Sequence, residues 1–258
     1  MDKNEARERV LMNALNARGK MNTEDAMEML EVSESTARRM FIRLENRGEI
    51  IRTIGGIQLV QENPMAYSFE RINSQNLEQK VQIGILSAGL IEPGDVVYLD
   101  SGTTTVQICN ALIRRINEDL LGDVTIFTNS LANLNVLSSV CTVHLIGGEY
   151  RIERRDFGGF MAEEAVKLVS FSKCFIGADG FVLPSGFTTT DFATASLNQI
   201  VLLRSGQKIV VADSSKFHRG SFVTHARTED ITCVITDKDI ADETKAALLS
   251  LGVNLLLG

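Results

Sequence analysis

The sequence reads VVYLDSGTTT at residues 96–105. This stretch is a short apolar run followed by polar residues, and the same pattern recurs along the chain. Comparable apolar runs lie at residues 124–127, 143–146, 174–176, 209–212 and 233–235. Short continuous apolar runs are typical of strands that are buried on both faces of a sheet. Because segments of helical length separate most of these runs, the sequence predicts an α/β domain with a mostly parallel sheet.

The polar ends of these runs form a candidate site. In an open parallel sheet, ligands bind beyond the carboxyl ends of the strands. The residues that collect at such ends, and that we predict to contact a small molecule, are Asp100, Gly102, Thr103, Thr104, Thr105, Asn129, Ser130, Gly148, Asp179 and Lys216. One polar strand end means little, but its repetition along the chain favours a binding site.

The most specific element is Gly102 with the three threonines that follow it. Glycine lets the backbone turn tightly, and threonines at a helix start place hydroxyls beside unpaired backbone N–H groups. This arrangement binds phosphate without a metal. The alternative is plain N-capping of the helix by a threonine. The spacing matches neither a P-loop nor the GxGxxG fingerprint, which disfavours a nucleotide ligand.

The N-terminal part, residues 1–60, predicts three helices followed by a hairpin. Apolar residues at helical spacing cover residues 5–17. Thr23 is the expected N-cap of a second helix, and a third, capped by Ser33, runs to just before Gly48. Two β-prone runs then surround a Gly-Gly turn. This order indicates a winged helix-turn-helix whose third helix enters the major groove of DNA. A three-helix module used only for dimerisation is the alternative.

The third helix carries most of the residues expected to contact DNA. Ala37, Phe41 and Leu44 repeat at helical spacing and form a buried stripe, which leaves the other faces free for a partner. The candidate DNA-binding residues are Ser33, Ser35, Thr36, Arg38, Arg39, Arg43 and, in the hairpin, Arg52. Arginine can bind guanine bidentately, whereas hydroxyls and a helix N-terminus reach phosphates.

Composition narrows the function classes. A net charge of −7 with 44% apolar residues predicts folded domains and argues against a uniformly basic coat for nucleic acid. The four cysteines form no CxxC pair and the three histidines have no metal-binding spacing, so we expect buried thiols and neither metal nor cofactor. The charged N-terminus and the lack of an apolar run near ~18 residues predict a soluble, cytoplasmic protein with no membrane partner.

Motifs in both parts of the chain resemble those of the DeoR family of bacterial transcriptional regulators. In the N-terminal part they are VSESTARRM at residues 32–40 and LENRGEIIRTIGGIQL at residues 44–59. Farther along they are SFERINSQNLEQK, YLDSGTTT, FTNSL, LIGGEYR, GADGF, SGFTTTDFA and ADSSKF, in this order. The likeness spans nearly the whole chain, and its motifs are specific in combination.

The resemblance implies a winged helix-turn-helix followed by an effector domain similar in fold to ribose-5-phosphate isomerase. Members of the family typically sense phosphorylated sugars or related metabolites. By this likeness, residues 102–105 would hold a phosphate. Asp100, Asn129, Asp179 and Lys216 would face the rest of the ligand.

Two stretches depart from the family pattern. Met40 stands where the family usually has an acidic residue directly after the two arginines. Residues 194–199 carry neither the glutamate nor the lysine that the family often has there. Arg151, a further candidate for the ligand site, and Arg154 could supply positive charge instead.

We expect a winged helix-turn-helix at residues 1–60, a linker at residues 61–76 and an α/β effector domain at residues 77–258. The predicted function is repression of a carbohydrate-utilisation operon. A phosphorylated sugar or related metabolite would control the binding of a homodimer or homotetramer to double-stranded operator DNA. No enzymatic turnover is expected, because hydroxyl donors should keep Asp179 a low-pKa acceptor that binds sugar hydroxyls.

Two other functions fit parts of the sequence. One is a sugar-phosphate isomerase-like enzyme with an accessory helical domain, for which Asp100, Asp179 or Glu149 would be the general base. The other is a protein-interaction adaptor that does not bind DNA, which would leave the arginines of the third helix without a role.

Overall fold

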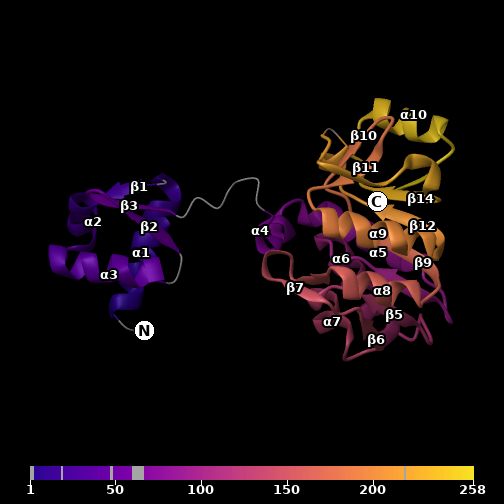
Figure 1. Cartoon of the computed structure of the whole chain (residues 1–258), viewed down its shortest axis with the longest axis horizontal. Coiled ribbons are helices and arrows are strands. Elements are labelled where there is room, and N and C mark those ends of the chain that lie inside the picture. The colour runs from indigo at the N-terminus through magenta and orange to yellow at the C-terminus, as the bar shows by residue number, and fades with distance from the viewer. Residues whose placement is uncertain (1–2, 19, 47–48, 60–66, 218) are drawn as a thin grey trace. The chain divides into compact units, whose positions relative to one another are not determined.

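Figure 1 shows the computed structural model of the chain, which describes residues 3–18, 20–46, 49–59, 67–217 and 219–258. The chain divides into two compact units, Met1–Ala66 and Tyr67–Gly258. The first unit has a single hydrophobic core, and the second has two cores of its own.

The N-terminal unit contains three helices and a small antiparallel sheet. Its elements are α1 (Lys3–Arg18), β1 (Lys20–Asn22), α2 (Thr23–Leu30), α3 (Glu34–Asn46), β2 (Ile50–Thr53) and β3 (Gly56–Leu59). The predicted hairpin is β2–β3, and β1, which was not predicted, pairs with β3 on its other side. Ala37, Phe41 and Leu44 lie in the core, as expected. This arrangement confirms the winged helix-turn-helix. Gly48, the predicted stop of the third helix, lies outside the described residues.

The first cap of this unit differs from the prediction by one residue. Asn22, not Thr23, caps α2, because its side chain accepts a hydrogen bond from the backbone N–H of Asp25 at 2.7 Å. The Thr23 hydroxyl instead donates to the carbonyl of Gly55 at 3.1 Å and fastens the hairpin turn to α2. Both residue types are common N-caps, so their order alone could not decide between them.

The second unit is built on one parallel sheet of seven strands. The strands are β4 (Val96–Leu99), β5 (Thr125–Thr128), β6 (Thr142–Leu145), β9 (Phe171–Ile176), β12 (Ser205–Val211), β14 (Cys233–Thr236) and β15 (Asn254–Leu257). All six apolar runs became strands of this sheet, which confirms the α/β prediction. The edge strand β15 was not predicted.

Helices cover both faces of the sheet (Figure 1). On one face lie α5 (Leu77–Gly89), α6 (Thr103–Asn117) and α7 (Leu131–Leu137), and on the other α8 (Phe160–Lys167), α9 (Phe192–Leu203) and α10 (Asp242–Ser250). Successive side chains of a strand point to opposite faces. Thus Val97 and Leu99 belong to the core under α5 and α6, and Tyr98 belongs to the core under α8 and α9.

The order of the strands locates a crevice. The sheet runs β15-β14-β12-β9-β4-β5-β6, so from β4 the chain proceeds to one edge through β5 and β6. It then returns to β9, beside β4, and proceeds to the other edge. The direction reverses between β4 and β9, and ligands of such sheets bind at this switch point, beyond the carboxyl ends of the two strands.

Short elements extend the loops around this crevice. They are the antiparallel sheet of β10 (Gly180–Val182), β11 (Gly186–Thr189) and β13 (Val223–Ala226), and the pair β7 (Glu149–Arg151) and β8 (Asp156–Gly158). Three single turns of 3-10 helix, η1 (Ile152–Arg154), η2 (Ser214–Lys216) and η3 (Thr228–Asp230), complete them.

The stretch predicted as a linker, residues 61–76, is structured where it is described. It contains α4 (Phe69–Ser74), Phe69 is buried, and the Lys80 ammonium donates to the carbonyl of Ile72 at 2.6 Å. The boundary between the two units therefore falls after Ala66, ten residues earlier than the sequence suggested. The polar composition of this segment did not reveal that it folds onto the second unit, because the residues it contacts lie far along the chain. Residues 61–66 lie outside the described residues.

Two further expectations concern the cysteines and membrane-spanning helices. Cys109, Cys174 and Cys233 are buried, Cys141 is half-buried, and all four thiols are free, as expected. Of the described helices, none combines the length and the apolar character that crossing a membrane requires.

Candidate functional site

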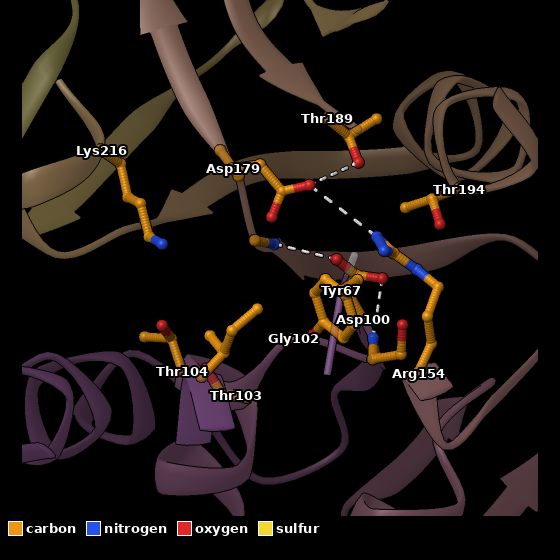
Figure 2. Close-up of a pocket in the computed structure, with 14 residues that line it drawn as sticks. Tyr67, Asp100, Gly102, Thr103, Thr104, Arg154, Asp179, Thr189, Thr194 and Lys216 are labelled. Carbon is orange, nitrogen blue, oxygen red and sulfur yellow. Dashed lines mark hydrogen bonds and ion pairs between the residues drawn. The ribbon is translucent and has the colours of Figure 1, made fainter. Parts of the chain in front are cut away.

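A pocket opens at the switch point between β4 and β9 (Figure 2). It encloses about 470 Å³, counting its open mouth. The residues that line it are Tyr67, Ile72, Asp100, Ser101, Gly102, Thr103, Thr104, Arg154, Gly177, Ala178, Asp179, Thr189, Thr194 and Lys216. They come from the segment before α5, the loops after both strands, and the starts of α6 and α9.

The start of α6 forms the floor of the pocket. Gly102 is its N-cap in extended backbone, and among the described residues no side-chain cap accepts a hydrogen bond from the first turn. The backbone N–H groups of this turn therefore stay available to an anion. Thr103 and Thr104 line the pocket, whereas the Thr105 hydroxyl donates to the carbonyls of Asp100 and Gly102, each at 2.6 Å. The cap is a glycine, so a threonine cap does not explain this sequence.

Asp100 joins the two strand ends. Its carboxylate accepts the backbone N–H of Ser101 at 2.7 Å and that of Gly177 at 3.0 Å. Burial raises the pKa of this carboxyl group, although the two hydrogen bonds act in the opposite direction. Since backbone N–H groups donate to both carboxylate oxygens, Asp100 both lines the crevice and holds it in shape.

Asp179 is the second carboxylate of the pocket. One oxygen, Oδ2, accepts hydrogen bonds from the hydroxyls of Thr189 and Thr190 and from the backbone N–H of Thr190, at 2.9–3.0 Å. Burial alone would raise its pKa, but Arg154 and these hydrogen bonds hold the pKa below the ordinary value. This confirms the expectation of a low-pKa acceptor. Figure 2 shows the other carboxylate oxygen directed into the pocket.

Two cations face this acceptor. The Arg154 guanidinium lies 3.8 Å from Asp179 Oδ2 and stacks over the ring of Tyr67, with its carbon 3.9 Å from the ring centre. Among the described residues, the Lys216 ammonium has neither a hydrogen bond nor an ion pair. In Figure 2 it extends over the pocket on the side of Thr104. The pocket thus combines free positive charge, open backbone N–H groups and an ionised acceptor.

Arg151, predicted to contact the ligand, is engaged elsewhere. Its guanidinium binds both carboxylate oxygens of Asp156 at 2.7 Å, contacts Asp191, and donates to the Thr194 hydroxyl at 3.1 Å. Arg154, one helical turn further on, lines the pocket instead. The sequence named both arginines as sources of charge and selected the wrong one, because their spacing does not reveal which side chain meets Asp156.

Three other predicted residues also lie outside the pocket lining. The Asn129 side chain accepts from the Tyr98 hydroxyl at 3.0 Å and donates to the carbonyl of Phe157 at 2.9 Å. Ser130 caps α7. Gly148 packs so closely that a Cβ there would lie 2.4 Å from the carbonyl oxygen of Gly158. With Thr105, these residues build the walls behind the pocket.

Some lining residues were not predicted. Tyr67 and Ile72 come from the segment predicted as a linker. Thr189 is the last residue of β11, and Thr194 lies in the first turn of α9. The only sequence signal for Thr189 was the run SGFTTTDFA, which was recognised as a motif but not assigned to the site.

On the candidate DNA-binding surface, the arginines differ in their partners. Arg38 pairs with Glu34 at 2.6 Å, Arg43 with Glu8 at 2.8 Å, and Arg52 with Glu45 at 2.6 Å. Arg39 has no carboxylate partner among the described residues, and its guanidinium donates to the Ser35 carbonyl at 3.2 Å. Of the four predicted arginines, Arg39 is therefore the one whose charge is not already neutralised within the domain.

The remaining residues of this surface lie at the start of α3. The Ser33 hydroxyl lies 3.1 Å from the Ser35 hydroxyl and 3.0 Å from that of Thr36. Met40 is fully buried in the core of the unit. At the position where the family usually has an acidic residue, this chain therefore has an apolar side chain that packs beneath α3. This side chain does not face DNA.

Family models match both units of the chain. The model of the DeoR-like helix-turn-helix domain matches residues 7–63, and the model of the DeoR C terminal sensor domain matches residues 75–238. The first covers the helices and hairpin of the N-terminal unit, and the second contains most of the pocket residues.

Relatives of known name match along most of the chain. It is 28% identical to the HTH-type transcriptional regulator IolR of Bacillus subtilis, over 87% of this chain and 88% of that protein. It is 31% identical to the HTH-type transcriptional repressor GlcR of the same species, over 88% and 86%. It is also 31% identical to the lactose phosphotransferase system repressor of Streptococcus mutans, over 92% of each.

The solved structures that match this chain are more distant in sequence. Ribose 5-phosphate isomerase A from Methanocaldococcus jannaschii matches 55% of each chain at 17% identity, with a TM-score of 0.42. The full-length sorbitol operon regulator SorC from Klebsiella pneumoniae matches 96% of this chain and 99% of its own at 14% identity, with a TM-score of 0.41.

Proposed function

Because the chain belongs to the DeoR family of transcriptional regulators, we propose that it represses a carbohydrate-utilisation operon under the control of a phosphorylated sugar. The observation that carries this proposal is the open start of α6, whose unpaired N–H groups share one pocket with Lys216 and Asp179. Relatives named as repressors of a lactose phosphotransferase system support the operon class.

In this proposal the ligand spans the pocket. Its phosphate accepts hydrogen bonds from the first turn of α6 and from Thr103 and Thr104, and the Lys216 ammonium neutralises part of its charge. The sugar hydroxyls donate to the ionised Asp179. Arg154 keeps that carboxylate ionised and offers its remaining N–H groups to the ligand.

The DNA-binding step belongs to the N-terminal unit. α3 enters the major groove of operator DNA, and Arg39 reads a base edge. Ser33, Ser35 and Thr36 reach phosphates at the helix start. The protein acts in the cytoplasm as a homodimer or homotetramer, because symmetric half-sites require at least two copies.

An isomerase with an accessory domain is the function that competes with this one. Aldose–ketose isomerisation needs a carboxylate poised near neutral pH beside the substrate. The lowered pKa of Asp179 favours a sensor. We expect NMR of pentose and hexose phosphates with the purified protein to show no interconversion. Interconversion that disappears in Asp179→Asn would show an enzyme instead.

The direct test uses Thr104→Glu, which places a carboxylate where the phosphate would bind. A thermal-shift screen of pentose and hexose phosphates first finds the ligand, since binding to the native state raises its stability. Calorimetry should then show the affinity of Thr104→Glu for that ligand lowered at least about tenfold by like-charge repulsion. Binding to an operator fragment selected from random DNA should persist but no longer respond to the ligand.

The matched control is Thr142→Glu, on the exposed edge strand β6 away from the pocket. It should bind the sugar phosphate and respond to it as the unmodified protein does. Undiminished affinity of Thr104→Glu for the ligand would show that the phosphate does not bind at the start of α6.

A further inference from the structure

Helix α9 presents an unusual outer face. Its twelve residues, FATASLNQIVLL, include no Asp, Glu, Lys or Arg. The inner side of the helix is packed on the sheet, as expected for a helix of this layer. On the outer side, however, Phe192 is 77% exposed and Leu203 is 82% exposed. A surface helix normally carries its polar and charged residues on the side away from the core.

The neighbouring helix extends this apolar surface. α8 packs against α9, and Arg204 joins their C-terminal ends by donating to the Val169 carbonyl and the Ser170 hydroxyl, each at 2.8 Å. The exposed apolar side chains of α8 and of the residue that caps it are Phe160 (74%), Met161 (73%) and Leu168 (86%). We call the surface made by Phe160, Met161, Leu168, Phe192 and Leu203 the α8–α9 face.

The α8–α9 face is large for the apolar patch of a single chain. An aromatic side chain carries about 150–250 Å² of surface, so Phe160 and Phe192 alone expose on the order of 300 Å². The largest apolar patch of an ordinary monomer measures roughly 300–600 Å². With Met161, Leu168 and Leu203 added, the α8–α9 face reaches the upper part of that range. It approaches the roughly 800 Å² that each partner buries in a stable interface.

The charge of the face indicates what covers it. In a contact between two identical copies, the same patch faces itself, so any net charge near the axis meets a like charge. α9 has no charge to repel, and on α8 the ammonium of Lys167 is paired with Glu164 at 2.5 Å. The half-buried Glu163 is the remaining charged residue of α8. A surface with so little net charge can face its own copy with little repulsion.

We propose that the α8–α9 face pairs two copies of this chain, and that this pairing supplies the symmetric dimer on which the proposed DNA binding rests. The same helix also reaches the ligand site. Thr194, in the first turn of α9, lines the pocket, and the Asn198 amide lies 3.5 Å from the Asp100 carboxylate. Any shift of α9 on ligand binding is therefore felt at the pairing surface, which couples the pocket to the relative placement of the two copies.

The test is the mass of the full-length chain in solution, by light scattering over a range of concentrations. The unmodified chain is expected to be a dimer or larger. Leu203→Glu and Leu168→Glu place a carboxylate in the face and should each weaken self-association at least about tenfold. The neutral Leu203→Ser should weaken it less. The control is Leu120→Glu, at an exposed leucine after α6 and outside the face, and it should leave the mass unchanged.

Three results would overturn the proposal. One is a monomeric unmodified chain at every concentration, as expected if residues 1–66 or another protein cover the face. Another is an unchanged mass for the double variant Leu168→Glu, Leu203→Glu, with circular dichroism showing it folded. The third is an equal loss of association in Leu120→Glu, which would make the effect one of net charge.

Calorimetry on the same proteins separates this proposal from the proposed function. A monomeric Leu203→Glu that still binds a sugar phosphate supports the pocket and the pairing surface together. An unmodified dimer that binds neither a sugar phosphate nor selected DNA would contradict the proposed function and leave the pairing surface in place.

Discussion

Arg39 shows how much a single side chain depends on its partners. The sequence offered several equivalent arginines for DNA, but ion pairs within the domain neutralise Arg38, Arg43 and Arg52. A paired arginine must give up its carboxylate before it can bind a base, and that exchange offsets part of what the base contact contributes. Arg39 has no carboxylate partner among the described residues, so it has no ion pair to break before it binds a base.

We therefore expect Arg39→Ala to weaken operator binding by about 1–3 kcal/mol, the range for loss of a bidentate base contact. Arg38→Ala, its neighbour on the same helix, should cost less, because Arg38 must break its ion pair with Glu34 before it can contact a base. Fluorescence anisotropy on labelled operator at fixed salt measures both. An equal loss in the two variants would mean that charge on α3, and not a base contact, supplies the affinity.

Arg151 and Arg154 form a second instructive pair. Arg151 binds the fully buried Asp156, so Arg151→Met leaves that carboxylate without its counter-charge. We expect a loss of about 3–5 kcal/mol in the free energy of unfolding, measured in urea. Arg154→Met should change stability much less and should lower affinity for the sugar phosphate. If Arg151→Met proved as stable as the unmodified protein, the ion pair with Asp156 would have no structural role.

His225 predicts how stability varies with pH. The side chain is buried, both ring nitrogens lack hydrogen-bond partners among the described residues, and burial lowers its pKa from 6.5 to about 4. Since the unfolded chain binds a proton more readily, stability is full above pH 6.5 and falls as the pH drops toward about 4. The shift corresponds to about 3 kcal/mol.

The measurement compares urea unfolding of the unmodified protein and His225→Leu between pH 7 and pH 4. The difference in stability between them should change with pH by about that amount, in favour of the variant at low pH. Parallel curves would show that His225 keeps an ordinary pKa in the folded protein.

Among the elements, the segment around α4 has the most unexpected place. It follows the N-terminal unit directly, yet Tyr67 and Ile72 line the pocket. The segment is held by Lys80, and by Asn76, whose amide donates to Asp213 at 2.9 Å. The chain that leads to the DNA-binding unit thus forms one wall of the pocket. This wall offers a route by which the ligand can influence DNA binding.

We expect Tyr67→Leu, which keeps apolar bulk but removes the ring under Arg154, to reduce the change in operator affinity that the sugar phosphate causes. Operator affinity without ligand should stay the same, because residue 67 is not part of the DNA-binding unit. Anisotropy titrations with and without ligand measure both quantities. A ligand response equal to that of the unmodified protein would exclude this wall as the route.

The whole molecule has separate cores, and this has a thermodynamic consequence. Leu11, Met40 and Phe41 belong to a core confined to the N-terminal unit, and the seven-stranded sheet has its own cores on both faces. Units with independent cores unfold as separate cooperative transitions. Calorimetry should therefore show two transitions, of which a saturating sugar phosphate raises only the larger. A single transition would mean that the units stabilise one another.

The fold could be read from the sequence to a large extent, for a local reason. Strands buried on both faces need short unbroken apolar runs, and all six such runs became strands of the parallel sheet. The N-terminal helices followed from apolar spacing and stop signals. β15 and β1 were missed because β1 has only three residues and because the last apolar stretch of the chain lacked a polar end.

The site could be read only in part. The predicted residues that line the pocket, because each follows a strand or opens a helix at the carboxyl edge of the sheet, are Asp100, Gly102, Thr103, Thr104, Asp179 and Lys216. Arg151, Asn129 and Ser130 follow strands of the same edge, but partners distant in sequence turn them away from the pocket. Tyr67 and Arg154 gave no positional signal that set them in the site.

The sequence by itself therefore determined the helices and strands and the edge of the sheet at which polar groups gather. Both could be predicted because hydrophobic periodicity and the polar residues at strand ends are patterns of only a few residues. Tertiary structure alone decided which of those groups face the ligand. That choice depends on hydrogen bonds such as Arg151 to Asp156 and on the switch between β4 and β9, which brings residues 100 and 177 together. Contacts between residues this far apart in the sequence leave no local pattern, because each residue fits its own helix, strand or loop equally well without the other.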